Sequence, residues 1–164
     1  MEHADISRDE VEVVRVERSV VVDAPIAEVW RALTRPDELG RWLGVEVDAG
    51  VETTLMEGLA ARLREADGSV RHLLVTEVDE GRRLAWHWWR SDGELSAVEI
   101  TIEPTIGESN VVRVVETLAS TPSALAGGGR AQLELAAGID HEWGVRLGGL
   151  ATRLGDKLGV AVPR

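Results

Sequence analysis

The segment VVVDAPIAEVWRALTRPDELGRWLG, residues 20–44, predicts the end of a strand followed by two short helices. Asp23 and Pro25 mark a helix start, because acidic residues and a first-turn proline are both favoured there. The helix predicted over 26–34 has apolar residues at i, i+3, i+4 and i+7, namely Ile26, Val29, Trp30 and Leu33. Pro36 then opens a second predicted helix over 36–43, whose inward-facing residues are Leu39, Trp42 and Leu43.

The stretch before these helices, VEVVRVERSVVVDA (11–24), is rich in valine and predicts a first strand. Residues 1–9 are polar and mixed in charge, so we expect a flexible tail there. The remaining residues, 10–160, are expected to form a single domain, because a chain of 164 residues suits one sizeable core.

After the helices, residues 45–118 consist of short apolar runs separated by turn signals. Asp67-Gly68 lies between two such runs and predicts a hairpin. Several short strands with a turn between each pair are typical of an antiparallel meander. The predicted strands are 45–47, 59–65, 70–78, 82–89, 95–104 and 110–118.

The C-terminal part begins with a loop over 119–130 that is rich in Gly, Ser and Pro. Residues 131–137 fit either a short helix or a loop. A long helix is predicted over 140–158, with Asp140 as its N-cap. Its apolar face consists of Trp143, Leu147, Leu150, Leu154 and Leu158, and glycines at four interior positions leave room for a close neighbour or for a ligand.

The composition excludes several classes of partner. The net charge of −11 disfavours nucleic acid and anionic membrane surfaces. No apolar run is long enough for membrane insertion and the N-terminus has no signal pattern, so we expect a cytoplasmic protein. Because the chain has no cysteine, disulfides, thiolate metal sites and thiol catalysis are excluded.

The segment 20–44 resembles the N-terminal signature of the START-like superfamily, also called SRPBCC or Bet v 1-like. More closely it resembles the branch named after the activator of the heat-shock-protein-90 ATPase. Residues 77–89, 98–118 and 141–154 support the resemblance. It implies an α+β helix-grip fold, in which a curved antiparallel sheet of six to seven strands wraps round a long C-terminal helix and two short helices follow the first strand. Proteins of this superfamily bind lipids, polyketides or hormones, and some are cyclases or hydrolases.

Glu116 is the strongest candidate for a functional polar group. It shares its strand parity with the apolar Val112 and Val114, and a carboxylate on such a face loses its hydration unless a cation or an N–H group pairs with it. Many relatives of this branch carry histidine at this position, so a ligand mode that depends on that imidazole is not expected here. The alternative is that the strand end frays and Glu116 reaches water.

The stretch RRLAWHWW (82–89) places Leu84, Trp86 and Trp88 on one face of a strand, and the resemblance favours that face as concave. Indoles there either line a ligand cavity or fill the core. Trp42 is expected near the cavity mouth, and Trp143 is expected to anchor the last helix. The predicted ligand-binding residues are Trp42, Trp86, Trp88, Val98, Ile100, Val112, Val114, Glu116, Trp143 and Leu147.

No nucleophile elbow, phosphate-binding loop or dinucleotide-binding motif occurs, and the four histidines form no metal-ligand spacing. We therefore expect neither a cofactor nor a metal, and the sequence leans against an enzyme. The leading hypothesis is a module that binds an apolar or amphipathic small molecule between sheet and helix. The alternatives are a cyclase, dehydratase or hydrolase that uses Glu116 as general base, and a co-chaperone-like or regulatory domain with a homodimer or protein partner.

Overall fold

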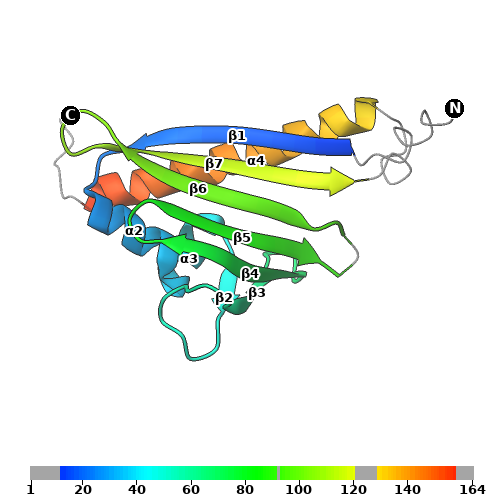
Figure 1. Ribbon diagram of the computed structural model, residues 1–164, viewed down its shortest axis with the longest axis horizontal. Coiled ribbons are helices and arrows are strands. Elements are labelled where there is room, and N and C mark those ends of the chain that lie inside the picture. The colour runs from blue at the N-terminus through cyan, green and yellow to red at the C-terminus, as the bar shows by residue number, and fades with distance from the viewer. Residues whose placement is uncertain (1–11, 92, 121–128, 158–164) are drawn as a thin grey trace, which may run out of the picture.

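The computed structural model describes residues 12–91, 93–120 and 129–157, which form a seven-stranded antiparallel sheet and three helices (Figure 1). The predicted tail at 1–9, residues 121–128 of the predicted loop and residues 158–160 lie outside this range. The elements are β1 (Glu12–Val22), α2 (Ile26–Thr34), α3 (Pro36–Leu43), β2 (Glu46–Asp48), β3 (Ala60–Arg64), β4 (Val70–Asp79), β5 (Arg83–Arg90), β6 (Ser96–Pro104), β7 (Asn110–Ser120) and α4 (Gly129–Lys157).

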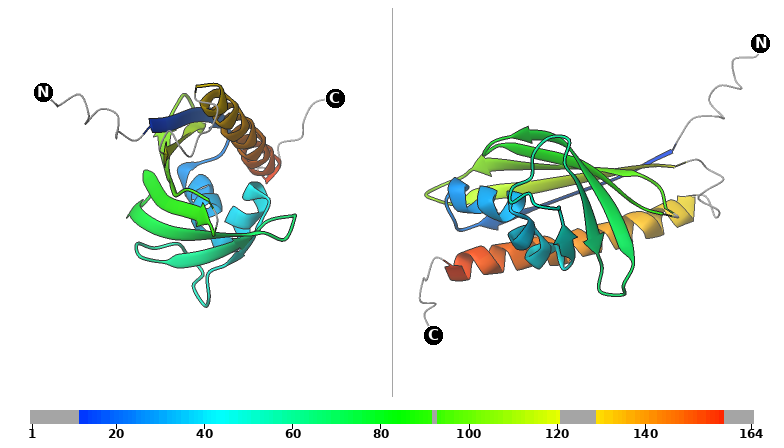
Figure 2. Two further views of the ribbon diagram at one scale, coloured as in Figure 1. Left: turned by 90° about the vertical axis from the view of Figure 1, so that its right-hand side faces the viewer. Right: turned by 90° about the horizontal axis from the view of Figure 1, so that it is seen from below.

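The sheet has the order β1-β7-β6-β5-β4-β3-β2, so every strand after β1 pairs with its neighbour in sequence. β1 instead pairs with the last strand, with Val22 opposite Asn110 and Glu12 opposite Ser120. The curved sheet wraps around α4, and α2 and α3 lie between the sheet and the C-terminal half of that helix (Figure 2). This is the predicted helix-grip fold.

Local sequence signals fix the two short helices, whose bounds match the predicted ones. α2 follows Pro25, and Pro36 occupies the first turn of α3, where its missing N–H costs nothing. α3 ends at Gly44, which adopts a left-handed conformation with φ 76° that residues with a Cβ rarely adopt. The seven strands lie within two residues of their predicted ranges.

The last helix is longer than predicted, which corrects both its start and its cap. α4 begins at Gly129, so residues 131–137 belong to its first turns and Asp140 lies in its interior rather than at its N-cap. The Asp140 carboxylate instead accepts a hydrogen bond of 2.9 Å from Arg18 on β1. Ala, Gln, Leu and Glu in this stretch are strong helix formers, and β1 supports the added turns.

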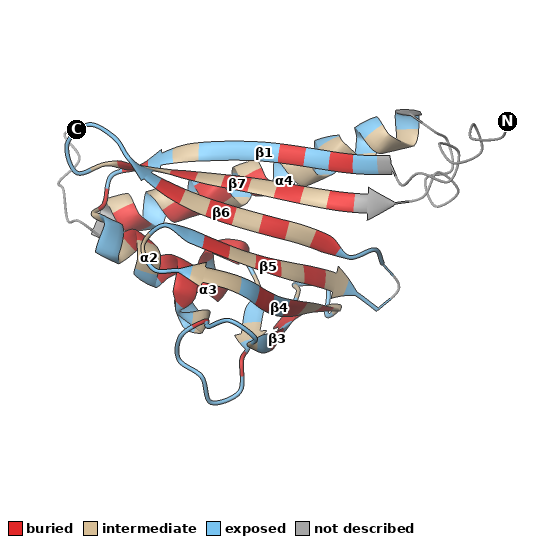
Figure 3. Ribbon diagram, viewed as in Figure 1, coloured by how far each residue is buried: buried red, intermediate tan, exposed pale blue. Residues whose placement is uncertain are grey.

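The concave side of the sheet is filled by side chains along the C-terminal half of α4. Trp143, Leu147, Leu150 and Leu154 are each at most 2% exposed and pack against the buried residues of the central strands. A smaller apolar cluster of Val14, Val16 and Leu118 packs against Leu135, Ala136 and Ile139 of the N-terminal half of the helix. The alternation of buried and more exposed positions along the strands can be followed in Figure 3.

Of the helix glycines, Gly144 is the one at which another element comes close. A Cβ there would lie 2.5 Å from the guanidinium of Arg18, whereas a Cβ at Gly148, Gly149 or Gly155 would meet nothing within 4 Å. Within the described part of the chain, no helix is long and apolar enough to cross a bilayer.

Candidate ligand-binding pocket

Five polar or charged side chains in the described part of the chain are buried: Thr34, Arg71, Ser96, Asn110 and Glu116. Two of them serve the backbone, since Thr34 donates to the carbonyl of Trp30 and Asn110 donates to that of Ala24, each at 2.8 Å. The other three, which come from β4, β6 and β7, line one common pocket. Burying polar groups is costly, so their convergence marks this pocket as a candidate site.

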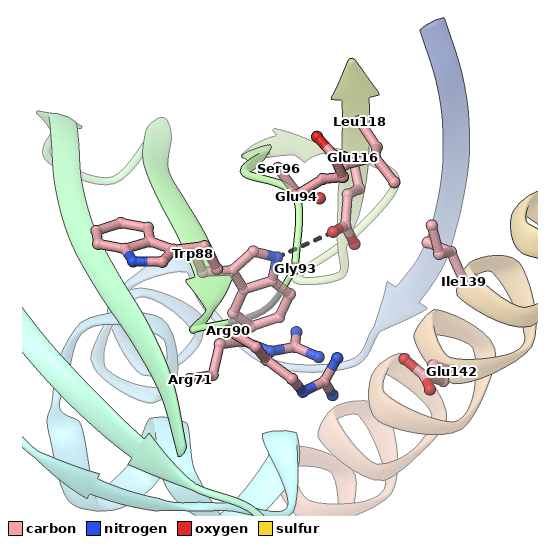
Figure 4. A pocket seen from close by; sticks show the side chains of 11 residues that line it. Arg71, Trp88, Arg90, Gly93, Glu94, Ser96, Glu116, Leu118, Ile139 and Glu142 are labelled. Atoms are coloured by element: carbon pink, nitrogen blue, oxygen red, sulfur yellow. Dashed lines mark hydrogen bonds between the residues drawn. The ribbon is translucent and has the colours of Figure 1, made fainter. Parts of the chain in front are cut away.

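The pocket has a volume of about 220 Å³ and lies between the ends of β4–β7 and the N-terminal half of α4 (Figure 4). Its apolar lining comes from Trp88, Trp89, Leu118 and Ile139. Beyond the three buried groups, Arg90, Glu94 and Glu142 complete the polar lining. The turn between β5 and β6, with Gly93, forms part of the rim. A space of this size, with polar and apolar walls, suits a small amphipathic molecule.

The Glu116 carboxylate joins the sheet to the helix at this pocket. Its Oε2 accepts a hydrogen bond of 2.9 Å from the indole N–H of Trp88 on β5, and its Oε1 accepts one of 2.7 Å from the indole N–H of Trp143 on α4. The residue is only 5% exposed. The predicted alternative, a frayed strand end that reaches water, is therefore wrong. The carboxylate has two charge-assisted partners in the interior.

The two indoles that hold Glu116 also stack on each other and lie beside guanidinium groups. The rings of Trp88 and Trp143 are 5.9 Å apart at an interplanar angle of 23°. Arg71 lies 4.1 Å from the centre of the Trp88 ring, and Arg146 lies 4.8 Å from that of Trp143. These cation–π contacts offset part of the cost of burying two positive charges next to Glu116.

On the β4–β5 side, the lining residues Arg71 and Arg90 are held by the carboxylate of Glu65 behind them. Arg90 donates from Nε and Nη2 to Glu65, at 3.0 and 2.8 Å, and the Nε of Arg71 lies 3.2 Å from the same carboxylate. Burial raises the pKa of Glu65, but the hydrogen bonds from Arg90 and the charge of Arg71 outweigh it and hold that pKa below its ordinary value. Burial and the charge of Arg90 lower the pKa of Arg71. Arg71 and Arg90 share this one carboxylate, and the charge of Glu116 also acts on Arg71.

The opposite wall is contributed by α4. Glu142 accepts a hydrogen bond of 3.4 Å from Arg146, one turn further along the helix. Burial lowers the pKa of the Arg146 guanidinium, and the charges of Glu142 and Glu116 counteract this effect. Among the described residues, no three His, Cys, Asp or Glu side chains are grouped as metal ligands would be.

Two of the predicted ligand-binding residues, Trp88 and Glu116, line the pocket, and Trp143 is bonded to the second of them. Trp86 is fully buried, and the centre of its ring lies 5.6 Å from that of Trp88. Its indole N–H has no hydrogen-bond partner in the described structure. Trp42 packs against Trp143 and donates to the carbonyl of Ala32 at 2.9 Å. The remaining predicted residues belong to the core: Val98, Ile100, Val112, Val114 and Leu147.

The sequence interpretation missed Arg71 and Ser96, although the signal that identified Glu116 applies to both. Arg71 shares its strand parity with the buried Leu73 and Val75, and Ser96 shares its parity with Val98. A polar residue in phase with a buried apolar face is the common pattern.

Comparison with known proteins places this fold in a family. Residues 23–155 match the model of the Activator of Hsp90 ATPase homolog 1-like proteins, AHSA1. The chain belongs to the AHSA1 family. No curated protein matches the chain significantly. Family membership agrees with the helix-grip architecture and with the branch that the sequence resembles.

Solved structures with the AHSA1-type fold include DynU16, a putative protein in the dynemicin biosynthetic locus. It is 26% identical with a TM-score of 0.66, and the match covers 87% of this chain but only 47% of DynU16. Protein MLL2253 from Mesorhizobium loti is 21% identical with a TM-score of 0.67, over 92% of this chain and all of that one. The Aha1 dimer from Colwellia psychrerythraea is 18% identical with a TM-score of 0.64, over 86% of this chain and 96% of that one. The last two show the shared fold alone.

Proposed function

We propose that this protein binds a small amphipathic molecule in the pocket between β4–β7 and the N-terminal half of α4. The observation that carries the proposal is the convergence of Arg71, Ser96 and Glu116 on one space. Each of these residues is at most 8% exposed, and gathering three polar side chains around one space is costly unless their polar atoms find partners there.

The unused hydrogen-bonding capacity of these groups supports the proposal. The hydroxyl of Ser96 makes no hydrogen bond to any described residue, and the only described polar partner of Arg71 is Glu65, through Nε. Polar groups that face a pocket without protein partners are matched there by water or by a ligand. A ligand that satisfies them gains specificity as well as affinity.

The apolar lining supports a ligand with a compact carbon frame. Leu118 and Ile139 face the pocket from β7 and α4, and Trp88 and Trp89 from β5. A volume of about 220 Å³ lies below the ~300–1,000 Å³ of pockets for drug-sized molecules, which favours a ligand of one ring or a short chain. The likeness to DynU16, a protein of a biosynthetic locus, favours a biosynthetic product or intermediate.

The test combines native mass spectrometry of the purified protein with calorimetric titration of small amphipathic compounds. Ser96→Leu fills the pocket from β6, and Thr101→Leu is the matched control, because it adds the same side chain on the opposite face of the same strand. We expect a bound ligand that is lost in Ser96→Leu and retained in Thr101→Leu. Circular dichroism checks that both variants fold. Equal binding by both variants, or no ligand by either method, would overturn the proposal.

Catalysis in the same pocket is a second proposal, supported by the position of Glu116 as a carboxylate on the pocket wall. Glu116→Gln would then abolish turnover of the bound compound while the compound still binds. Unchanged turnover would remove Glu116 from any mechanism. The cytoplasmic location and a homodimer or regulatory protein partner stay predictions, and light scattering of the purified protein tests for the homodimer.

A further inference from the structure

Two polar groups of the pocket contact the same indole: a cation lies over the face of the Trp88 ring, and a hydrogen-bond acceptor lies at its N–H. The Trp88 ring lies 4.1 Å below the guanidinium of Arg71, and its N–H donates to Glu116 at 2.9 Å. Arg71 therefore lies over the face of this ring and Glu116 at its edge, and both line the pocket. A ligand that contacts both must carry two different polar groups on a short frame.

At the Glu116 side, the free groups match a hydroxyl. Each carboxylate oxygen accepts one indole N–H, which leaves lone pairs because a carboxylate can accept about four hydrogen bonds. The hydroxyl of Ser96 lines the same pocket and has no described partner. A ligand hydroxyl would donate to Glu116 and accept from Ser96.

Other groups fit this side less well. A ligand carboxylate would be repelled by Glu116. An ammonium would lie near Arg71 and Arg146, which already balance the charge of Glu116. A neutral donor avoids both costs.

At the Arg71 side, the free groups match an anion. Arg71 and Arg90 share the Glu65 carboxylate, and the terminal nitrogens of Arg71 and the Nη1 of Arg90 make no hydrogen bond to any described residue. Guanidinium groups bind carboxylates in planar, bidentate pairs. Glu142 faces this region from α4, but it is half exposed and is paired with Arg146.

We infer that the ligand class is a small hydroxy carboxylate, with its hydroxyl on Glu116 and Ser96, its carboxylate on Arg71 and Arg90, and its carbon frame against Leu118 and Ile139. The inference rests on the proposed function, since it names the chemistry of the molecule bound in the same pocket. It separates this class from purely apolar ligands, which offer no partner to the Ser96 hydroxyl or to the terminal nitrogens of Arg71.

The experiment compares ligands on the unaltered protein, so it does not depend on how a variant folds. Isothermal titration is carried out with 3-hydroxybenzoate and 4-hydroxybenzoate, with benzoate, which lacks the hydroxyl, and with phenol, which lacks the carboxylate. We expect at least one hydroxybenzoate to bind at least tenfold more tightly than both benzoate and phenol.

Two variants then assign the ends of the ligand. Arg71→Met is expected to weaken the hydroxybenzoates and benzoate at least tenfold and to leave phenol unchanged, with Arg113→Met on β7 as the control because Arg113 does not line the pocket. Ser96→Ala is expected to weaken only the ligands that carry a hydroxyl.

The outcomes separate the inference from the proposed function. Equal affinities for benzoate, phenol and the hydroxybenzoates overturn the hydroxy carboxylate class while pocket binding stands. If none of these four compounds binds, but a different compound binds and Ser96→Leu blocks its binding, the hydroxy carboxylate class is likewise overturned while pocket binding stands. If no compound binds and Ser96→Leu changes nothing, both proposals fail.

Discussion

Replacing Glu116 by glutamine tests whether this carboxylate joins the sheet to the last helix. The carboxylate accepts hydrogen bonds from Trp88 and Trp143, whereas the glutamine amide has one acceptor oxygen and turns its NH₂ group toward the other indole N–H. A lost buried hydrogen bond to a charged group costs about 1.5–3 kcal/mol, and the orphaned N–H costs about 1–3 kcal/mol. Removing the buried charge returns part of this, so we expect a net destabilisation of about 2–4 kcal/mol.

The assay is urea unfolding followed by far-ultraviolet circular dichroism, in which this change corresponds to a midpoint about 1–2 M lower with an unchanged slope. Glu103→Gln is the matched control, because Glu103 is an exposed residue of β6, and its free energy of unfolding is expected to change by less than about 0.5 kcal/mol.

A double-mutant cycle isolates the contact with the helix. Trp143→Phe removes one of the two N–H groups, so glutamine at position 116 can serve Trp88 alone in the double variant. We expect the double variant to lose about 1–3 kcal/mol less than the sum of the two single losses. Strict additivity, or a Glu116→Gln midpoint equal to that of Glu103→Gln, would refute the reasoning.

Three further substitutions test the helix and the charged wall. Gly148→Ala should stabilise the protein by about 1 kcal/mol and raise Tm by about 2–4 °C, because its Cβ meets open space and alanine favours the helix. Gly144→Ala should show none of this gain in the same melting experiment, because its Cβ displaces Arg18. In the folded protein the pKa of Glu65 is lowered from 4.5, so its contribution to stability is complete above that pH and is lost as the pH falls further. When the free energy of unfolding is measured against pH, Glu65→Gln should lose less stability in acid than the unaltered protein. The same acid loss in both proteins would contradict the role of Arg90.

Local patterns predicted most of the fold. Pro25 and Pro36 fix the starts of two helices, alternation placed Trp86 and Trp88 on one face, and the family resemblance indicated that this face is concave. The start of α4 was missed because Asp140 resembles a cap, while contact with β1 supports the turns that precede it. Such contacts depend on tertiary packing, which a single sequence does not encode in any local pattern.

The pocket was harder to predict than the sheet. Parity singled out Glu116, and the same argument applied to Arg71 and Ser96 would have added two more of its residues. The indole that completes the arrangement, Trp143, comes from α4, and its bond to Glu116 depends on how far that helix lies from the sheet. Strand alternation gives the face of a residue but not the distance to another element.

The pairing of β1 with β7 has a consequence for synthesis. β1 leaves the ribosome before every strand of the meander, yet its partner becomes available only after β7 emerges. A valine-rich strand therefore waits unpaired in the nascent chain, in the condition that favours aggregation. Arg15, Glu17 and Arg18 interrupt its apolar run and protect it during that interval, as gatekeeper charges do.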